Sequence, residues 1–186
     1  MHRCFIDKSF IDAFKLSTTQ SLPKEVAHRL IKVVRIKPSE EFGLFDGQGR
    51  QIIAKLDAKS LSLHDARLIE QSPPKPGLTL LQAVIEETKL TQTLKRGTEF
   101  GIDHFVIFSG EFSEPFLLEK LMKREQRFLN VLIDAARQSG RLFVPSLVFA
   151  KDLSAALENI TGAYWGIFGN ITAEKLLSCA LKEKGT

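Results

Sequence analysis

A strand–helix–strand pattern over residues 78–110 constrains the fold of this chain more than any other feature. The apolar run 78–84 is too short for a typical helix and predicts a buried strand. The polar segment 88–100 has two leucines four residues apart and is followed by glycine, which predicts a helix with a glycine C-cap. The apolar run 104–108 predicts a second strand. This order is typical of a crossover unit, so we expect parallel strands with the helix on one face.

The same alternation continues toward the C-terminus. Segment 117–138 predicts the longest helix, with a broad apolar face. Further on we expect a third strand over 145–150, a short helix capped by Asp152, a fourth strand over 163–168 and a last helix over 173–184. The second part of the chain is therefore predicted to be an α/β domain with a parallel sheet.

The first part of the chain has a different pattern. Residues 1–6 alternate loosely and predict an edge strand, and a helix is expected to begin at Pro23 and to end before Pro38. The Asp-Gly pair at 46–47 is a strong hairpin signal because it tolerates positive φ angles. One helix with several antiparallel strands predicts a small β-barrel, since closure removes exposed sheet edges.

The proline-rich segment 72–77 separates the two patterns. Its three prolines cannot continue a strand or a helix, and they form a semi-rigid extended spacer. We therefore predict a two-domain protein in which the domains keep a defined orientation. It comprises a barrel at 1–71, the linker at 72–77 and an α/β domain at 78–186.

The distribution of charge differs between the two parts. Residues 1–77 contain 13 Lys and Arg against 9 Asp and Glu, whereas residues 78–186 contain 13 of each, so the net charge of +4 belongs to the first part. A positive field favours a polyanionic partner, because neutralised phosphates release counterions. Basic residues also keep proteins soluble, and charge alone supports both interpretations equally.

Several function classes are excluded by the absence of their motifs. The two cysteines cannot form a disulfide scaffold, and no apolar run reaches the length of a membrane span, so we expect a cytoplasmic protein without a membrane anchor. The chain has no P-loop, no G-x-G-x-x-G after its first parallel strand and no G-x-S-x-G elbow. The four histidines lack metal-ligand spacing, so no metal is expected. Of these, His104 fits a core position, and only His28 has a plausible role with nucleic acid.

An open parallel sheet binds its ligand at the carboxyl ends of its strands. Gly169 follows the fourth predicted strand and would allow a flat ring or a sugar to approach the backbone. A simple turn glycine is about twice as common in such a place. Both readings therefore stay open from the residues alone.

Three groups of motifs carry a family resemblance. The segment H-R-L-I-K-V-V-R at 28–35, with F-D-G at 45–47, looks like a PUA-like RNA-binding barrel. The segment K-L-T-Q-T-L-K-R-G-T-E-F-G at 89–101 is similar to a K-[ML]-x-x-x-x-Q-K-x-x-E-L-G helix. The run A-A-R-Q-S-G-R at 135–141, with V-P at 144–145, matches A-A-E-Q-S-G-R-x-x-V-P. With these motifs in this order, the chain resembles the 16S rRNA uracil-N3 methyltransferases of the SPOUT (α/β-knot) superfamily.

The resemblance implies a specific activity. A homodimer would methylate N3 of a uridine in 16S rRNA of the small ribosomal subunit, with S-adenosylmethionine (SAM) as methyl donor. The PUA-like barrel would hold the RNA, and the SPOUT domain would bind SAM in a C-terminal knot. Because N3 of uracil is a poor nucleophile until it loses its proton, positioned polar groups must lower the barrier.

The resemblance also implies site residues. The candidates for RNA binding are Arg3, His28 and Arg35. The candidates for the active centre or the dimer face are Glu99, Gln138 and Arg141. The candidates for one wall of the cofactor pocket are Phe168 and Gly169.

The chain departs from the family pattern at three places. The loop at 110–113 reads G-E-F-S where the family has S-E-R-[SC], so the arginine is missing. Arg137 replaces an acidic residue. The chain stops at Thr186, before the strand, the G-P-E-G-G loop and the L-R-x-E-T-A knot of the family. We therefore expect an α/β domain truncated before its knot, in a shortened form of a longer protein, with weakened binding of SAM.

Two other interpretations stay open. A non-catalytic RNA-binding protein with a degenerate methyltransferase module would bind RNA in a salt-sensitive manner without transferring a methyl group. A generic α/β domain with incidental charge would not bind RNA at any salt concentration.

Overall fold

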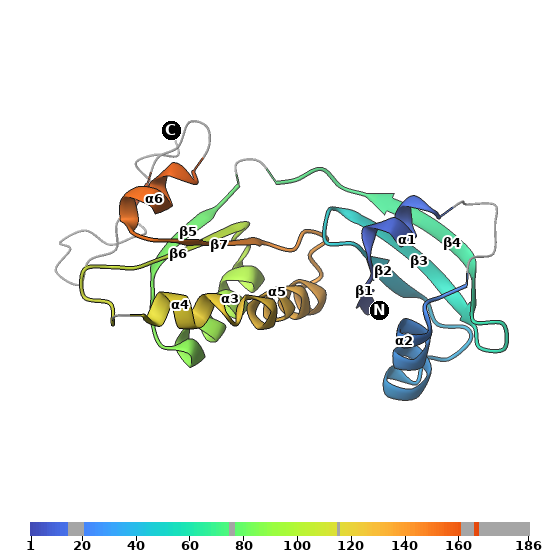
Figure 1. Ribbon diagram of the computed structural model, residues 1–186. Helices are drawn as coiled ribbons and strands as arrows, with labels where there is room; N and C mark the ends of the chain where they lie inside the picture. Colours follow the sequence, from blue (N-terminus) through green and yellow to red (C-terminus); the bar gives the residue numbers. More distant parts are fainter. Residues whose placement is uncertain (15–20, 75–76, 115, 161–165, 168–186) are drawn as a thin grey trace.

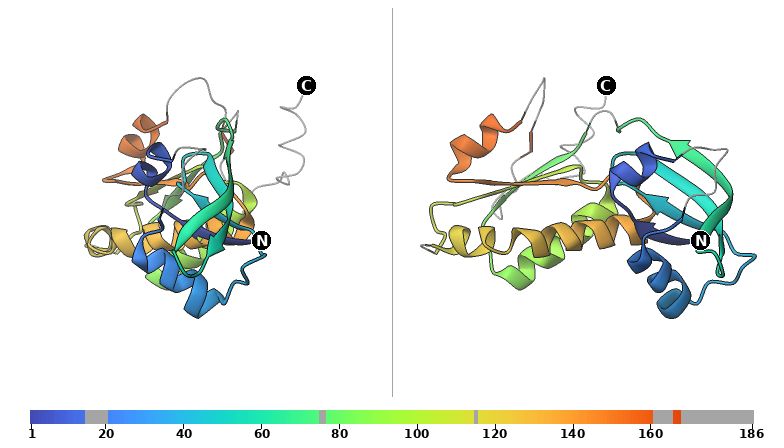
Figure 2. Two further views of the ribbon diagram at one scale, coloured as in Figure 1. Left: turned by 90° about the vertical axis from the view of Figure 1, so that its right-hand side faces the viewer. Right: turned by 45° about the vertical axis from the view of Figure 1, so that its right-hand side comes forward.

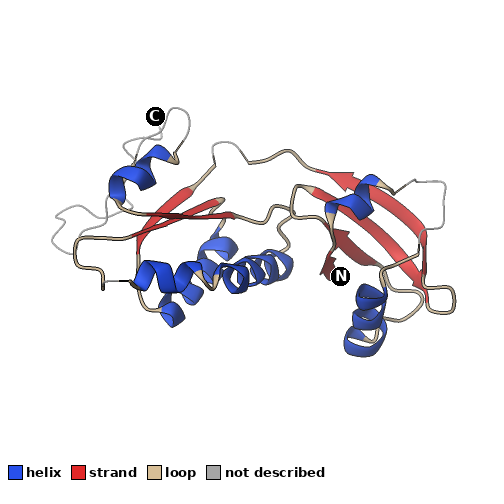
Figure 3. Ribbon diagram, viewed as in Figure 1, coloured by secondary structure: helices blue, strands red, loops and turns tan. Residues whose placement is uncertain are grey.

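The protein contains two β-sheets that lie side by side, each with its own helices (Figures 1 and 3). The computed structural model describes residues 1–14, 21–74, 77–114, 116–160 and 166–167. The first sheet has four strands in the order β1-β2-β3-β4, and the second has three strands in the order β5-β6-β7.

The first sheet is mixed. Its strands are β1 (His2–Phe5), β2 (Phe42–Phe45), β3 (Arg50–Asp57) and β4 (Ser62–Glu70). The edge strand β1 pairs parallel with β2, and the other neighbours are antiparallel. The predicted hairpin joins β2 to β3: Gly47 has a φ of 73°, and the Asp46 carboxylate accepts hydrogen bonds from the Gln48 backbone N–H at 2.8 Å and the Arg50 Nε at 2.7 Å. These bonds hold the turn in one conformation.

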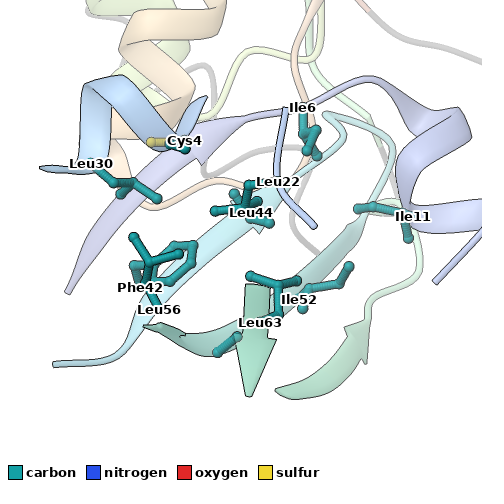
Figure 4. Packing of buried hydrophobic residues seen from close by; sticks show 12 residues of the cluster. Cys4, Ile6, Ile11, Leu22, Leu30, Phe42, Leu44, Ile52, Leu56 and Leu63 are labelled. Carbon is teal, nitrogen blue, oxygen red and sulfur yellow. The ribbon is translucent and has the colours of Figure 1, made fainter. Parts of the chain in front are cut away.

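The expected closed barrel is not seen in the described residues. Strands β1 and β4 lie at opposite edges of the sheet and do not pair. Helices cover the apolar face instead: α1 (Lys8–Asp12), α2 (Lys24–His28) and the π-helix η1 (Arg29–Val34). Figure 4 shows Ile11 and Leu30 beside Leu44 and Ile52 of the sheet, in one buried cluster. Because helices remove this face from water, the core forms without closure of the sheet.

The predicted helix after Pro23 forms, but only its first part is α-helical. From Arg29 the chain winds as a π-helix, and it ends at Arg35 in the left-handed region with φ 56°. A regular spacing of 3.6 residues would bury Val33 with its neighbours, whereas Val33 is 69% exposed and Leu30 is fully buried. The wider π-turn rotates the following side chains away from the positions that a regular α-helix would give them.

The second sheet confirms the predicted parallel arrangement. Its strands are β5 (Thr79–Ala83), β6 (His104–Phe108) and β7 (Ser146–Ala150), and its helices are α3 (Glu87–Phe100), α4 (Leu117–Met122), α5 (Glu125–Ser139) and α6 (Leu153–Glu158). Both strand pairs are parallel. Helix α3 ends at Gly101 with φ 100°, as the glycine C-cap predicted. Helices α3, α4 and α5 cover one face of the sheet, and α6 lies on the other (Figures 1 and 2).

The prediction of one long helix over 117–138 is wrong in one respect, because the structure divides this segment into α4 and α5. The break lies at Lys123 and Arg124, where the Arg124 backbone leaves the helical region with φ −111°. The side chains of Arg124 and Arg127 both bond the carboxylate of Glu87 on α3. The apolar pattern cannot reveal this break, since the ion pairs that accompany it involve a residue 37 positions away.

Backbone hydrogen bonds join the two sheets in addition to the linker. The Val144 N–H donates to the Gly47 carbonyl at 2.9 Å, and the Gly49 N–H donates to the Leu142 carbonyl at 3.0 Å. A small core of Phe45, Ala136 and Leu142 lies beside these bonds. The hairpin of the first sheet and the segment before β7 therefore determine how the sheets are oriented.

The predicted fourth strand over 163–168 and last helix over 173–184 lie outside the described residues, except for 166–167. Within the ranges that the structure describes, no helix is both long enough and apolar enough to cross a membrane.

Candidate functional site

The carboxyl ends of the three parallel strands meet at one edge of the second sheet. Ala83, Phe108 and Ala150 are the last residues of β5, β6 and β7, and the pairing register places them side by side. The loops that follow therefore gather at this edge, where open α/β sheets bind their ligands. We call this edge of the second sheet, where β5, β6 and β7 end, the carboxyl edge.

An open cavity of about 500 Å³ lies at the carboxyl edge between the segment after β5, the start of α3, the loop after β6 and α4. Its lining includes Val84, Glu86, Thr88, Phe112, Glu114 and Lys120. Its volume falls within the range of about 300–1,000 Å³ that small-molecule sites occupy. Its wall combines apolar, acidic and basic side chains, so it can contact a ligand that has both apolar and polar parts.

The loop after β6 is held in a defined turn beside this cavity. The Gly110 N–H donates to the Ser113 hydroxyl at 2.9 Å, and the Ser113 N–H donates to the Gly110 carbonyl at 3.0 Å. Gly110 approaches β5 so closely that a Cβ atom there would lie 3.3 Å from the Cβ of Ala83. These contacts fix the backbone that presents Phe112, whose side chain is 94% exposed.

Glu87 is an acidic residue at the cavity with a structural partner. Its carboxylate bonds Arg124 and, at 2.6 Å, Arg127. The hydrogen bond from Arg124 lowers the pKa of Glu87, and the positive charges of Arg124, Arg127 and Lys120 lower it further, against an opposing effect of burial. Glu87 is therefore ionised and paired at neutral pH, which makes it a poor proton acceptor for catalysis. The exposed carboxylates Glu86 and Glu114 have no such partner among the described residues.

The predicted active-centre candidate Arg141 lies at the opposite, amino edge of the parallel sheet. Its guanidinium donates to the carbonyls of Thr98 at 2.9 Å and Ile102 at 2.8 Å, and it forms an ion pair with Asp103. The other oxygen of Asp103 accepts the Leu78 N–H at 3.0 Å. Arg141 thus ties the end of α3 to the starts of β5 and β6.

The candidates Glu99 and Gln138 also belong to the amino edge. Glu99 lies in the last turn of α3 and forms an ion pair with Arg96 at 3.0 Å. Gln138 lies in the last turn of α5 and is exposed. The structure therefore places Glu99, Gln138 and Arg141 away from the cavity at the carboxyl edge.

The predicted RNA-binding residue Arg3 is directed into the protein. Its Nη2 donates to the Gln51 Oε1 at 2.7 Å, and burial lowers its pKa. Gly43 leaves the space that Gln51 occupies, since a Cβ at this position would lie 1.8 Å from the Gln51 Nε2. Arg3 also approaches Gly140 at the end of α5. These contacts place Arg3 between the first sheet and the end of α5.

The other two RNA-binding candidates lie on an exposed basic face. His28 ends α2, and Arg35 follows η1. The exposed side chains of this basic face are His28, Arg29, Lys32, Arg35 and Lys37. Within the described part of the chain none of them forms an ion pair. Cations without carboxylate partners are free to contact phosphates.

The cofactor candidates Phe168 and Gly169 lie outside the described residues. Among the residues that are described, no group of three or more His, Cys, Asp or Glu side chains is arranged to hold a metal ion. Sequence reasoning missed the cavity residues Phe112 and Lys120. The unusual G-E-F-S loop after the second parallel strand was a signal for Phe112, whereas Lys120 looked like one of several basic residues on the polar side of a helix.

Comparison with known proteins gives matches to one family and to several solved structures. The RNA methyltransferase domain family matches residues 72–184. The structure is similar to a ribosomal RNA small subunit methyltransferase E from Neisseria gonorrhoeae bound to S-adenosyl methionine, with a TM-score of 0.65 and 25% identity over 87% of this chain and 66% of that one. A SAM-bound protein from Legionella pneumophila, assigned as a methyltransferase, shares the fold with a TM-score of 0.64 and 20% identity over 85% and 66% of the two chains. The chain thus spans just under two thirds of the length of these structures.

Proposed function

This chain belongs to the RNA methyltransferase domain family, and from that premise we propose that it transfers a methyl group from SAM to RNA. The observation that carries the proposal is that a protein family and a solved structure both match the part of the chain that contains the parallel sheet. The family matches residues 72–184, and the fold is that of a SAM-bound rRNA methyltransferase that is 25% identical. An open parallel sheet with a cavity at its carboxyl edge is compatible with this chemistry.

The carboxyl edge offers groups that suit the polar parts of SAM. The loops that follow the three parallel strands bring backbone N–H and C=O groups to this edge, and these groups can form hydrogen bonds with the ribose and the amino acid part of SAM. The absence of a side chain at Gly110 lets the loop after β6 lie close to β5. We propose that SAM binds at this edge and that Phe168 and Gly169, which the resemblance assigns to the cofactor pocket and which lie outside the described residues, contribute to its binding. When bound, SAM supplies an electrophilic methyl group for the acceptor nitrogen.

We further propose a division of labour between the two parts of the chain. Residues 1–71, a PUA-like unit by resemblance, contact the RNA backbone through the basic face of α2 and η1. Residues 78–186, joined through the linker 72–77, present the methyl donor. The free cations of the basic face support the first assignment, and the family match supports the second. The hydrogen bonds from Val144 to Gly47 and from Gly49 to Leu142 keep the two parts in one orientation.

The specific reaction that we propose is methylation of N3 of a uridine in 16S rRNA by a cytoplasmic homodimer. The similarity to a small subunit rRNA methyltransferase supports the class of RNA. The N3–H of uracil must be lost before the nitrogen attacks, so the site must accept this proton as well as orient the base. The new N–C bond forms as the C–S bond of SAM breaks, and S-adenosylhomocysteine leaves.

Isothermal titration calorimetry of the 186-residue protein with SAM tests the proposal. Because the chain spans just under two thirds of the length of its SAM-bound relatives, we expect weak but saturable binding of SAM, for which S-adenosylhomocysteine competes. The Arg29→Ala variant is a matched control on the basic face: it should bind SAM like the wild type and bind RNA more weakly. Absence of SAM binding, with salt-sensitive RNA binding retained, would instead indicate a non-catalytic RNA-binding protein.

A further inference from the structure

Phe112 is an aromatic side chain that the fold displays to solvent at the cavity of the carboxyl edge. It is 94% exposed, although phenylalanine is among the residue types most often buried. Its backbone is not loose, because the paired hydrogen bonds between Gly110 and Ser113 hold the loop in a turn. The protein therefore presents this ring from a structured loop and leaves its face free.

The surroundings of Phe112 match the chemistry of a pyrimidine base. The cavity holds about 500 Å³ and is lined by Phe112, Lys120 and the carboxylates of Glu86 and Glu114. Uracil presents a flat face, two carbonyl acceptors and one N–H donor between them. An ammonium group can donate to a carbonyl, and a carboxylate can accept the N–H, so both kinds of polar partner stand beside an aromatic platform.

From this arrangement we infer that Phe112 is the stacking platform for an unpaired uracil base of the RNA, with Lys120 and the carboxylates of the cavity at the polar edge of that base. The inference rests on the proposed function and names the site that takes the nucleotide. Enzymes that modify a base must take it out of the stack, and an extruded base is held by aromatic stacking together with hydrogen bonds to its edge. The cavity also lies at the same edge at which we propose that SAM binds, so the base and the methyl donor would be neighbours.

Binding of a short single-stranded RNA that contains one uridine tests the inference through fluorescence anisotropy. Loss of one base–aromatic stack weakens binding by about 5- to 150-fold, so we expect an increase of the Kd in this range for Phe112→Ala. Phe112→Trp should bind at least as tightly as the wild type. Phe100→Ala is the matched control, because Phe100 is 84% exposed but lies at the end of α3, at the amino edge.

Cross-linking gives a readout that a structural role of Phe112 would not change. RNA with 5-bromouridine in place of the uridine should cross-link on irradiation to the peptide that contains Phe112. Cross-links confined to the basic face, or an unchanged Kd for Phe112→Ala, would overturn the inference. If the protein still transfers methyl groups in that case, the proposed function is unaffected. A change of oligomeric state in Phe112→Ala with unchanged RNA affinity would show that a second protein copy occupies the surface, and it would also overturn the inference. A wild-type protein that binds neither RNA nor SAM would refute both the inference and the proposed function.

Discussion

Substitution of Arg141 by methionine separates a structural role from a role in the active centre. Arg141 bonds two carbonyls at the end of α3 and pairs with Asp103, and the side chains of this pair are only 16% and 12% exposed. Removal of one partner of a buried ion pair costs about 3–5 kcal/mol because the remaining charge is left unpaired. Since both side chains keep some contact with water, we expect a loss of about 3 kcal/mol.

This loss translates into a large change of melting temperature. For a chain of this size, 1 kcal/mol corresponds to about 2–4 °C, so the Tm of Arg141→Met should fall by about 6–12 °C in thermal unfolding followed by circular dichroism. Arg137→Met is a matched control, because Arg137 pairs at 3.2 Å with Asp134, whose side chain is 57% exposed. We expect this control to change the stability by less than about 1 kcal/mol.

A double substitution isolates the ion pair itself. In Arg141→Met, the further change Asp103→Asn removes the unpaired charge, so the double variant should be more stable than the sum of the two single effects predicts. An unchanged Tm for Arg141→Met, accompanied by loss of methyl transfer, would refute the structural role and would favour the active-centre role that the sequence suggested.

Three further predictions concern packing, pH and RNA binding. Gly97→Ala should destabilise the protein by about 1–3 kcal/mol in urea unfolding, because the added Cβ would lie 2.7 Å from the ring of Phe105. Lys95→Ala, on the exposed side of α3, should not change the free energy of unfolding in this way. The pKa of Glu87 is lowered from 4.5, so the stabilising effect of its ion pairs is complete above about pH 4.5 and is lost as the pH falls through the lowered pKa. Glu87→Gln should abolish the part of the acid dependence of Tm that comes from this carboxylate. An unchanged dependence of Tm on pH in this variant would contradict the pairing with Arg124. Each phosphate contact contributes about 0.7–0.9 to the slope of the logarithm of the RNA association constant against the logarithm of the salt concentration. The double variant Lys32→Ala, Arg35→Ala should therefore reduce this slope by about 1.5. Lys59→Ala, in the turn between β3 and β4, should leave the slope unchanged.

Local sequence patterns predicted the second sheet well for clear physical reasons. Strands β5, β6 and β7 are short apolar runs, and α3 ends at a glycine that adopts positive φ. Asp152 accepts a hydrogen bond from the Ala155 N–H at 2.8 Å, as expected of a helix cap. In each case the deciding interaction lies within a few residues, so the sequence pattern contains it.

The features that were missed depend on contacts between distant residues. The division between α4 and α5 accompanies the pairing of Arg124 and Arg127 with Glu87, and the interior position of Arg3 depends on Gln51. The open first sheet depends on how helices α1 and α2 pack over it. The exposure of Phe112 is different, because it results from a local turn closed by Ser113. None of these contacts has a periodic signal along the chain.

Mass spectrometry of nucleosides tests the central claim most directly. The protein is incubated with SAM and with small ribosomal subunits that lack the modification, and the 16S rRNA is then digested to nucleosides. The account predicts formation of 3-methyluridine, in proportion to the S-adenosylhomocysteine released and dependent on the presence of SAM. Binding of both SAM and RNA without any methylated nucleoside would contradict it.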